Sequence, residues 1–165
     1  SEPETQALNR FFESKRDSIT MAVSLHSYGR SILHPYSCQS LGMKLNSTFL
    51  SLFQFAVEDL LQNIHAKYTT GQAWATPGLY SVNGDAVDYL FSHFAIPSFS
   101  VEVGFPLFKT QLPPSYPQLS EMRGFWPSME PFLEECNQLL LNALRTSGCN
   151  LQLGRRFLKV GVRGC

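Results

Sequence analysis

The chain has 165 residues, of which 44% are hydrophobic and 16% are charged, and its 13 basic side chains balance its 13 acidic ones. This composition is that of a globular domain with a hydrophobic core, and it argues against a disordered chain. The balanced charge argues against nucleic-acid binding, and no apolar run reaches the roughly 18 residues that a membrane helix needs.

Residues 2–15 have the pattern of an amphipathic helix. Ser1 and Glu4 fit a capping box, and Pro3 lies in the first turn. The apolar stripe of this helix consists of Ala7, Leu8, Phe11 and Phe12. The sequence begins with serine rather than methionine, and its first residues lack the basic and apolar regions of a signal peptide. We expect residue 1 to be a cut in a longer chain, because a free amino group would oppose the helix dipole.

The next segments alternate between strand and helix patterns. Ile19–Leu25 is almost continuously apolar, which predicts a strand buried on both faces, and Ser31–Tyr36 predicts a short second strand. Apolar residues recur at helical spacing over Leu45–Ala66, where the phenylalanine-rich part should be core. A long loop follows, with one short strand near Gln72–Ala75. Asp85–Phe94 predicts a short helix capped by Asn83 or Asp85.

The rest of the chain contains one strong strand and one helix. Residues 98–103 read SFSVEV, a strand, and residues 104–127 are rich in proline and glycine, as in an irregular loop. Glu130–Arg145 predicts the last helix, ending near Gly148. We expect residues 1–148 to form one structural unit and the basic tail, 149–165, to be poorly ordered.

This alternation predicts an α/β fold with a parallel or mixed sheet and flanking helices. Only three or four strands are predicted, so one edge of the sheet should be exposed. Because Ile19–Leu25 lacks the character of an edge strand, we expect part of the sheet to lie outside this chain.

Three chemically active residues occur near the ends of elements. His26 follows the first buried strand, Tyr80 lies in a loop before a helix, and Glu102 is near the end of the SFSVEV strand. Ligands gather at the carboxyl ends of strands in open α/β sheets, so these residues could share a pocket. The plainer alternatives are a strand-end histidine bonded to a backbone carbonyl, a surface carboxylate and a loop aromatic.

These residues lie in motifs that resemble the zinc metallocarboxypeptidases of the pancreatic type. The matching segments, in the family's order and at its separations, are SEPETQAL (1–8), SLHSYGRSILHPY (24–36), LYSVNGDAVDY (79–89) and SFSVEV (98–103). The resemblance covers residues 1–103 well and 104–147 more loosely. It implies that this chain is the C-terminal part of a carboxypeptidase-like mixed-sheet catalytic domain.

The resemblance assigns roles to individual residues. His26 is similar to the family's third zinc ligand, and Glu102 to the general base for the zinc-bound water that hydrolyses the C-terminal peptide bond. Tyr80 resembles the mobile tyrosine that closes over the substrate. Ser27 and Tyr28 lie where the family contacts the rest of the peptide.

Val87 falls at the base of the family's specificity pocket. An apolar residue there favours apolar or aromatic C-terminal residues, although Asp85 and Asp88 lie close by in the sequence. The resemblance further implies that peptide or protein C-termini are the substrate, and that the protein is secreted.

The departures from the family pattern concern the other ligands. No histidine here is followed by glutamate at the third position, so the family's H-x-x-E ligand motif is absent. The arginine and Asn-Arg pair that grip the substrate carboxylate precede the SEPET segment in the family. A catalytic zinc takes about three protein ligands, so we expect this chain alone to be inactive. Val103, Gly104 and Phe105 also replace the usual Leu-Arg-Asp.

The main alternative is a truncated or degenerate homologue without catalysis, which at most binds peptides or a partner. A serine or cysteine hydrolase is disfavoured, because there is no G-x-S-x-G motif and no activated cysteine. The other histidines, His34, His65 and His93, are expected to be structural. Cys136 and Cys149 could pair or could simply be buried.

Overall fold

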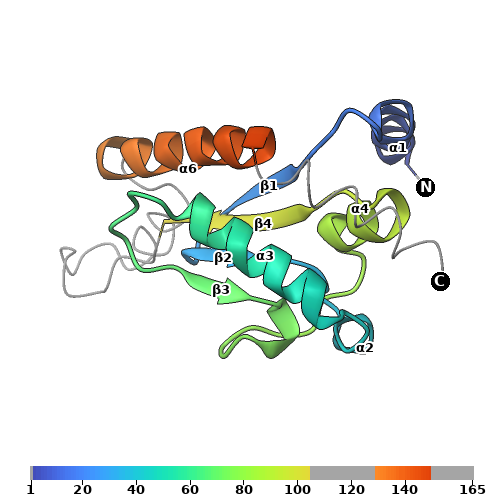
Figure 1. Cartoon of the computed structure of the whole chain (residues 1–165), viewed down its shortest axis with the longest axis horizontal. Coiled ribbons are helices and arrows are strands. Elements are labelled where there is room, and N and C mark those ends of the chain that lie inside the picture. Colours follow the sequence, from blue (N-terminus) through green and yellow to red (C-terminus); the bar gives the residue numbers. More distant parts are fainter. Residues whose placement is uncertain (1, 105–128, 150–165) are drawn as a thin grey trace, which may run out of the picture.

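The computed structural model of the chain describes residues 2–104 and 129–149. The expected loop after Gly104 and the basic tail therefore lie almost wholly outside the described residues. The elements, in chain order, are α1 (Pro3–Lys15), β1 (Ala22–Ser27), β2 (Ser31–Leu33), α2 (Gln39–Gly42), α3 (Ser47–Leu60), β3 (Thr69–Gly71), the 3-10 helix η1 (Ala73–Ala75), α4 (Ala86–Phe94), β4 (Ser98–Val103) and α6 (Met129–Cys149) (Figure 1).

The four described strands form one mixed sheet in the order β1-β4-β2-β3. β1 runs parallel to β4, β4 runs antiparallel to β2, and β2 runs parallel to β3. Helices pack around this sheet, so the α/β class with a mixed sheet is confirmed. Crossover segments that contain helices are needed wherever two strands run parallel, which explains the alternation of elements in the sequence.

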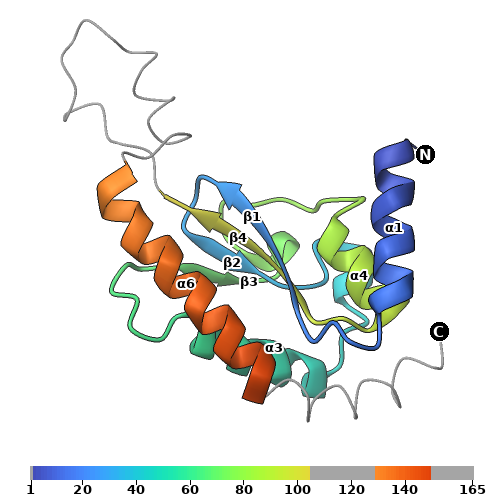
Figure 2. The ribbon, with the colours of Figure 1, turned by 90° about the horizontal axis from the view of Figure 1, so that it is seen from above.

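The hydrophobic core lies on one face of the sheet, beneath α3 and α6. Phe53 and Leu60 of α3 and Leu139 of α6 pack against the strands, whose inward residues include Phe99 and Val101. Figures 1 and 2 show α3 and α6 running along the sheet while α1 and α4 lie together at one end. The predicted assignment of the phenylalanine-rich helix to the core is therefore confirmed.

The opposite face of β4 is polar. Successive side chains of a strand point to opposite faces, so Phe99 and Val101 enter the core while Ser98, Ser100 and Glu102 project from the other face. Both faces of β4 are buried from Ser98 to Val101, and only the last two residues of the strand, Glu102 among them, are partly exposed.

The strand predicted at Ile19–Leu25 differs from the observed β1. The strand begins at Ala22 and ends at Ser27, and it is one of the two edge strands of the described sheet. Leu25 is 54% exposed, so the prediction of a strand buried on both faces was wrong. Its apolar sequence is only half covered because, in the described residues, β4 alone pairs with it.

Several predicted boundaries also shift. The second strand ends at Leu33, because Pro35 interrupts the ladder soon afterwards. The short loop strand lies at Thr69–Gly71, and residues 73–75 form η1 instead. The N-cap of α1 is Glu2, without a side-chain capping bond, and the predicted capping residue Ser1 lies outside the described residues.

Candidate functional site

His26 and Glu102 face each other across the two parallel strands β1 and β4. They are direct Cα partners in the strand register, and each lies one residue before the end of its strand. Partners in a parallel pair project from the same face of the sheet, so both side chains lie on its polar face. The structure therefore brings together two of the three residues that the sequence singled out.

A serine two residues earlier orients the imidazole of His26. The Ser24 hydroxyl lies 2.8 Å from Nε2 of His26, and both residues are on the same face of β1. The imidazole itself is exposed. A histidine whose one nitrogen is held by a hydrogen bond offers the other to a proton or a metal, so Nδ1 is the nitrogen available here.

Glu102 is partly buried at the end of β4. Burial raises the pKa of its carboxyl group above the ordinary value, and the nearby charge of His26 opposes this effect. On its other side Glu102 pairs in register with Ser31 of β2, which is 4% exposed. The Ser31 hydroxyl has no hydrogen-bond partner among the described residues, so a second polar group stands next to the carboxylate.

The turn after β1 closes over Glu102. A Cβ atom on Gly29 would collide with Oε2 of Glu102, so any other residue at this position would require the carboxylate to move. The Gly29 N–H donates to the carbonyl of Gly104, 3.1 Å away, and ties the turn to the end of β4. Ser27 and Tyr28, which precede Gly29, are half-buried in this same turn and are joined by a cis peptide bond.

Tyr80 lies apart from this pair. Its side chain is 76% exposed, and none of the described hydrogen bonds or ring contacts joins it to His26 or Glu102. The flanking residues are anchored: Ser81 Oγ accepts from the Gln39 N–H at 3.0 Å, and the Val82 N–H donates to the Ser37 carbonyl at 3.1 Å. The loop is thus held next to the tyrosine while the phenol itself projects into solvent.

Val87 lies in the first turn of α4 and is 1% exposed, so its side chain belongs to the interior of the described residues. Asp85 caps this helix by accepting from the Val87 N–H at 3.1 Å, and it also accepts from the Ser37 hydroxyl at 2.6 Å. Both carboxylate oxygens of Asp88 accept from the Ser37 N–H at 2.9 Å. Burial, more than the nearby charge of Asp85, raises the pKa of Asp88.

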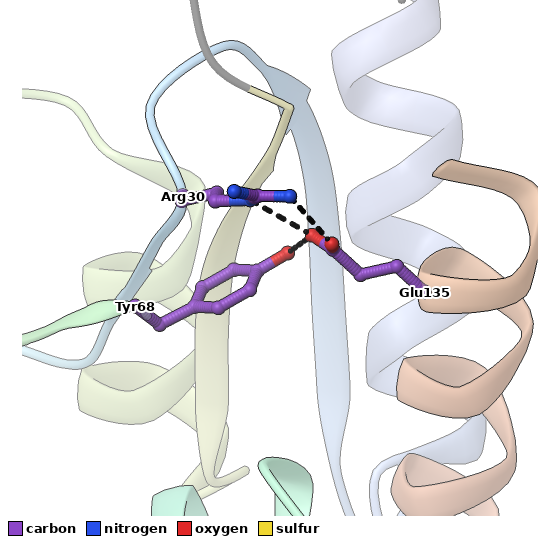
Figure 3. Close-up of polar contacts among 3 residues, drawn as sticks. All are labelled: Arg30, Tyr68 and Glu135. Atoms are coloured by element: carbon purple, nitrogen blue, oxygen red, sulfur yellow. Dashed lines mark hydrogen bonds and ion pairs between the residues drawn. The ribbon is translucent and has the colours of Figure 1, made fainter. Parts of the chain in front are cut away.

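Sequence reasoning missed a cluster formed by Arg30, Tyr68 and Glu135, which come from three segments (Figure 3). Arg30 and Glu135 are 105 residues apart, so no local pattern could reveal their contact. The cluster adjoins the candidate site because Arg30 follows Gly29 directly.

Within the described residues, the other histidines and the cysteines Cys38 and Cys136 do not extend the site. His34 is buried, stacks on Phe53 with ring centroids 4.9 Å apart, and its Nδ1 lies 2.8 Å from the Pro35 carbonyl oxygen. Cys38 and Cys136 are both free thiols. In the part of the chain that the structure describes, no three or more His, Cys, Asp or Glu residues are grouped to hold a metal.

Comparison with known proteins identifies the family to which this arrangement belongs. A model of the M14 peptidases, the zinc carboxypeptidases, matches residues 1–138. The chain belongs to the zinc carboxypeptidase family. It is 31% identical over 121 residues to carboxypeptidase B of the dog, and 33% identical over 89 residues to human carboxypeptidase O. Those alignments cover 70% and 54% of this chain.

The chain spans only part of these zinc carboxypeptidases: 29% of the canine protein and 23% of the human one. Two solved structures share the fold. Carboxypeptidase A from Helicoverpa armigera matches 92% of this chain and 36% of its own, at 18% identity and a TM-score of 0.52. The match to bovine thrombin-activatable fibrinolysis inhibitor, solved with a tick carboxypeptidase inhibitor, covers 89% of this chain and 45% of that protein's chain, at 22% identity and a TM-score of 0.56.

Proposed function

We propose that this chain supplies the C-terminal part of the catalytic domain of a zinc-dependent metallocarboxypeptidase, which removes C-terminal residues from peptides or proteins. The observation that carries this proposal is the register pairing of His26 with Glu102 at the carboxyl ends of two parallel strands. The family match over residues 1–138 and the partial coverage of the relatives support it.

Zinc, when bound in such a site, lowers the pKa of a bound water and polarises the substrate carbonyl. His26 offers one ligand, whereas a catalytic zinc takes about three protein ligands. The described residues therefore do not form a zinc centre by themselves. We expect this chain alone to bind zinc weakly and to be inactive as a peptidase.

The chain's own residues have distinct tasks in this proposal. Glu102 accepts the proton of the attacking water, and a carboxyl group whose pKa is raised by burial is better matched to that task than a fully solvated one. Tyr80, exposed on an anchored loop, covers the bound C-terminal residue. Ser27 and Tyr28 contact the peptide further along, and Val87 sets an apolar preference from within the domain.

A second candidate function is a homologue without catalysis that binds peptide C-termini or a protein partner. It is favoured by the incomplete ligand set among the described residues. Extension of the encoding transcript in the 5′ direction distinguishes the two. An H-x-x-E motif followed by Asn-Arg upstream of residue 1 supports the enzyme, whereas a start codon directly before Ser1 supports the second candidate.

Equilibrium dialysis of the 165-residue chain against zinc tests the ligand count. Weak binding, far from one tightly held ion per chain, is the expected result. Tight stoichiometric binding would contradict it and would show that other residues complete the site. We also propose, from the family resemblance, that the protein is secreted. Separately, none of the described helices has both the length and the apolar character that a membrane crossing requires.

A further inference from the structure

Glu135 of α6 is the centre of a partly buried polar cluster, which we call the Glu135 clamp and which consists of Arg30, Tyr68 and Glu135. Nη2 of Arg30 donates to Oε2 of Glu135 at 2.9 Å, and Nε donates to Oε1 at 3.4 Å. The Tyr68 hydroxyl donates to Oε1 at 2.5 Å. Figure 3 shows the guanidinium and the phenol converging on the one carboxylate.

The clamp joins three segments that are distant in sequence. Arg30 lies in the turn between β1 and β2, Tyr68 directly precedes β3, and Glu135 lies on α6. The side chain of Glu135 is only 10% exposed, against 26% for Arg30. Removal of one partner from an ion pair that is largely shielded from water leaves the other group without compensation, which destabilises the local structure.

The clamp connects directly to the candidate site through the backbone of Gly29. That residue is packed against the Glu102 carboxylate and bonded to Gly104, and the next residue is Arg30. Arg30 has a left-handed backbone with φ of 46°, which is unfavourable for a residue with a Cβ and persists where surrounding contacts enforce it. Its carbonyl accepts from the Thr69 N–H at 2.9 Å, which fixes the other side of the turn.

We propose that Glu135 is a positioning residue for the turn of residues 27–30: by holding Arg30, it fixes Gly29 against Glu102 and thereby places Ser27 and Tyr28 for peptide binding. The peptide-binding part of this inference rests on the proposed function. The positional part concerns the apoprotein and stands independently of zinc and of activity.

The alternative is that Glu135 merely attaches α6 to the sheet. α6 provides a matched control for this, because Asn142 attaches the same helix at another point. Nδ2 of Asn142 donates to the carbonyls of Leu60 and Gln62, at 2.9 Å and 2.7 Å. Loss of Asn142 should loosen α6 without touching the turn, whereas loss of Glu135 should release the turn itself.

The test compares Glu135→Gln with Asn142→Ala in the full chain by amide hydrogen exchange and by amide NMR shifts. In Glu135→Gln, the Gly29 and Thr69 amides should exchange about tenfold faster than in the parent, because local opening is no longer opposed by the ion pair. The resonances of Ser27, Tyr28 and Gly29 should also move. In Asn142→Ala, the same amides should follow only the change in global stability, and those resonances should stay in place.

Equal effects of the two variants on the Gly29 amide would overturn the inference, as would an unchanged Gly29 amide in Glu135→Gln. If Glu135→Gln does not fold, Tyr68→Phe replaces it, because this variant removes one donor and keeps the ion pair. Tyr68→Phe should raise the exchange rate of the Gly29 amide by a smaller factor, and an unchanged rate would contradict the clamp. Since neither readout uses zinc, failure of the clamp and failure of the carboxypeptidase proposal are distinguishable.

Discussion

His26 and Glu102 occupy partner positions on the adjacent parallel strands β1 and β4, 76 positions apart in the printed sequence but opposite each other in the sheet. Each precedes the last residue of its strand, where an open α/β sheet gathers its functional groups. The Ser24 hydroxyl holds one nitrogen of His26, and Gly29 is packed against the carboxylate of Glu102. The pair is thus oriented by its own strand and by the turn that follows.

The close approach of Gly29 to Glu102 predicts that one added methyl group displaces the carboxylate. In Gly29→Ala the new Cβ would overlap Oε2 of Glu102, so the turn or the carboxylate must shift. Overpacking of a core typically costs about 1–3 kcal/mol of unfolding free energy, and the loss here should lie at the lower end of that range because Oε2 is the far end of a flexible side chain. Urea unfolding followed by circular dichroism measures this loss.

A double-mutant cycle shows whether Glu102 causes that loss. In the Glu102→Ala background the carboxylate is absent, so the additional change Gly29→Ala should cost much less than in the parent chain. Additive losses from the two substitutions would contradict the assigned contact and would trace the penalty to the backbone of the turn.

Because Asp85 is the N-cap of α4, we expect substitution of Asp85 to lower the stability of the fold and substitution of the nearby Asn83 to leave it unchanged. Asp85 accepts from the Val87 N–H and from the Ser37 hydroxyl, so Asp85→Ala removes both a cap and a tie to the preceding loop. Loss of an N-cap costs about 1–2 kcal/mol. Asn83→Ala, at an exposed position, should leave thermal stability nearly unchanged. Equal losses of stability in the two variants would contradict the assignment of Asp85 as the cap.

His34 predicts a pH dependence of stability. Burial lowers its pKa from the ordinary value of 6.5, so the folded chain binds a proton at this site less readily than the unfolded chain does. Stability is therefore complete above pH 6.5 and is lost as the pH falls through the lowered pKa of the folded state. Urea unfolding at pH 5 and at pH 7 measures this difference.

The variant His34→Phe should reduce the loss of stability between pH 7 and pH 5. A phenyl ring keeps the stacking on Phe53, and the Pro35 carbonyl keeps a second donor in Gln72 Nε2 at 3.0 Å. His65→Gln, which changes an exposed histidine, serves as the control against which the pH dependence of His34→Phe is compared. If the pH dependence is unchanged in His34→Phe, groups other than His34 cause the loss of stability at low pH.

Local sequence patterns predicted the elements whose signals are themselves local. β4 and α4 follow from local patterns over fewer than a dozen residues, and the structure decides for Asp85 between the two predicted caps of α4. β1 was misjudged because an apolar run does not reveal how many neighbours a strand has in the sheet. The short β3 was misplaced because three residues with two exposed side chains carry almost no periodic signal.

The candidate site was predictable only in part. The sequence placed His26 and Glu102 near strand ends, but their register depends on pairing between segments far apart in the chain. The Glu135 clamp escaped prediction for the same reason, since its members are brought together by the docking of α6. The roles of Tyr80 and Val87 remain predictions. Tyr80 is exposed on its loop, and Val87 lies in the interior.

A zinc titration of the chain followed by NMR of the four histidine imidazoles tests most directly whether His26 is a metal ligand beside Glu102. His65, which is also exposed, provides the internal comparison for non-specific binding. The His26 resonance should shift at a lower zinc concentration than that of His65, and Glu102→Gln should weaken this response. Simultaneous shifts of His26 and His65, unaffected by Glu102→Gln, would contradict the proposed site.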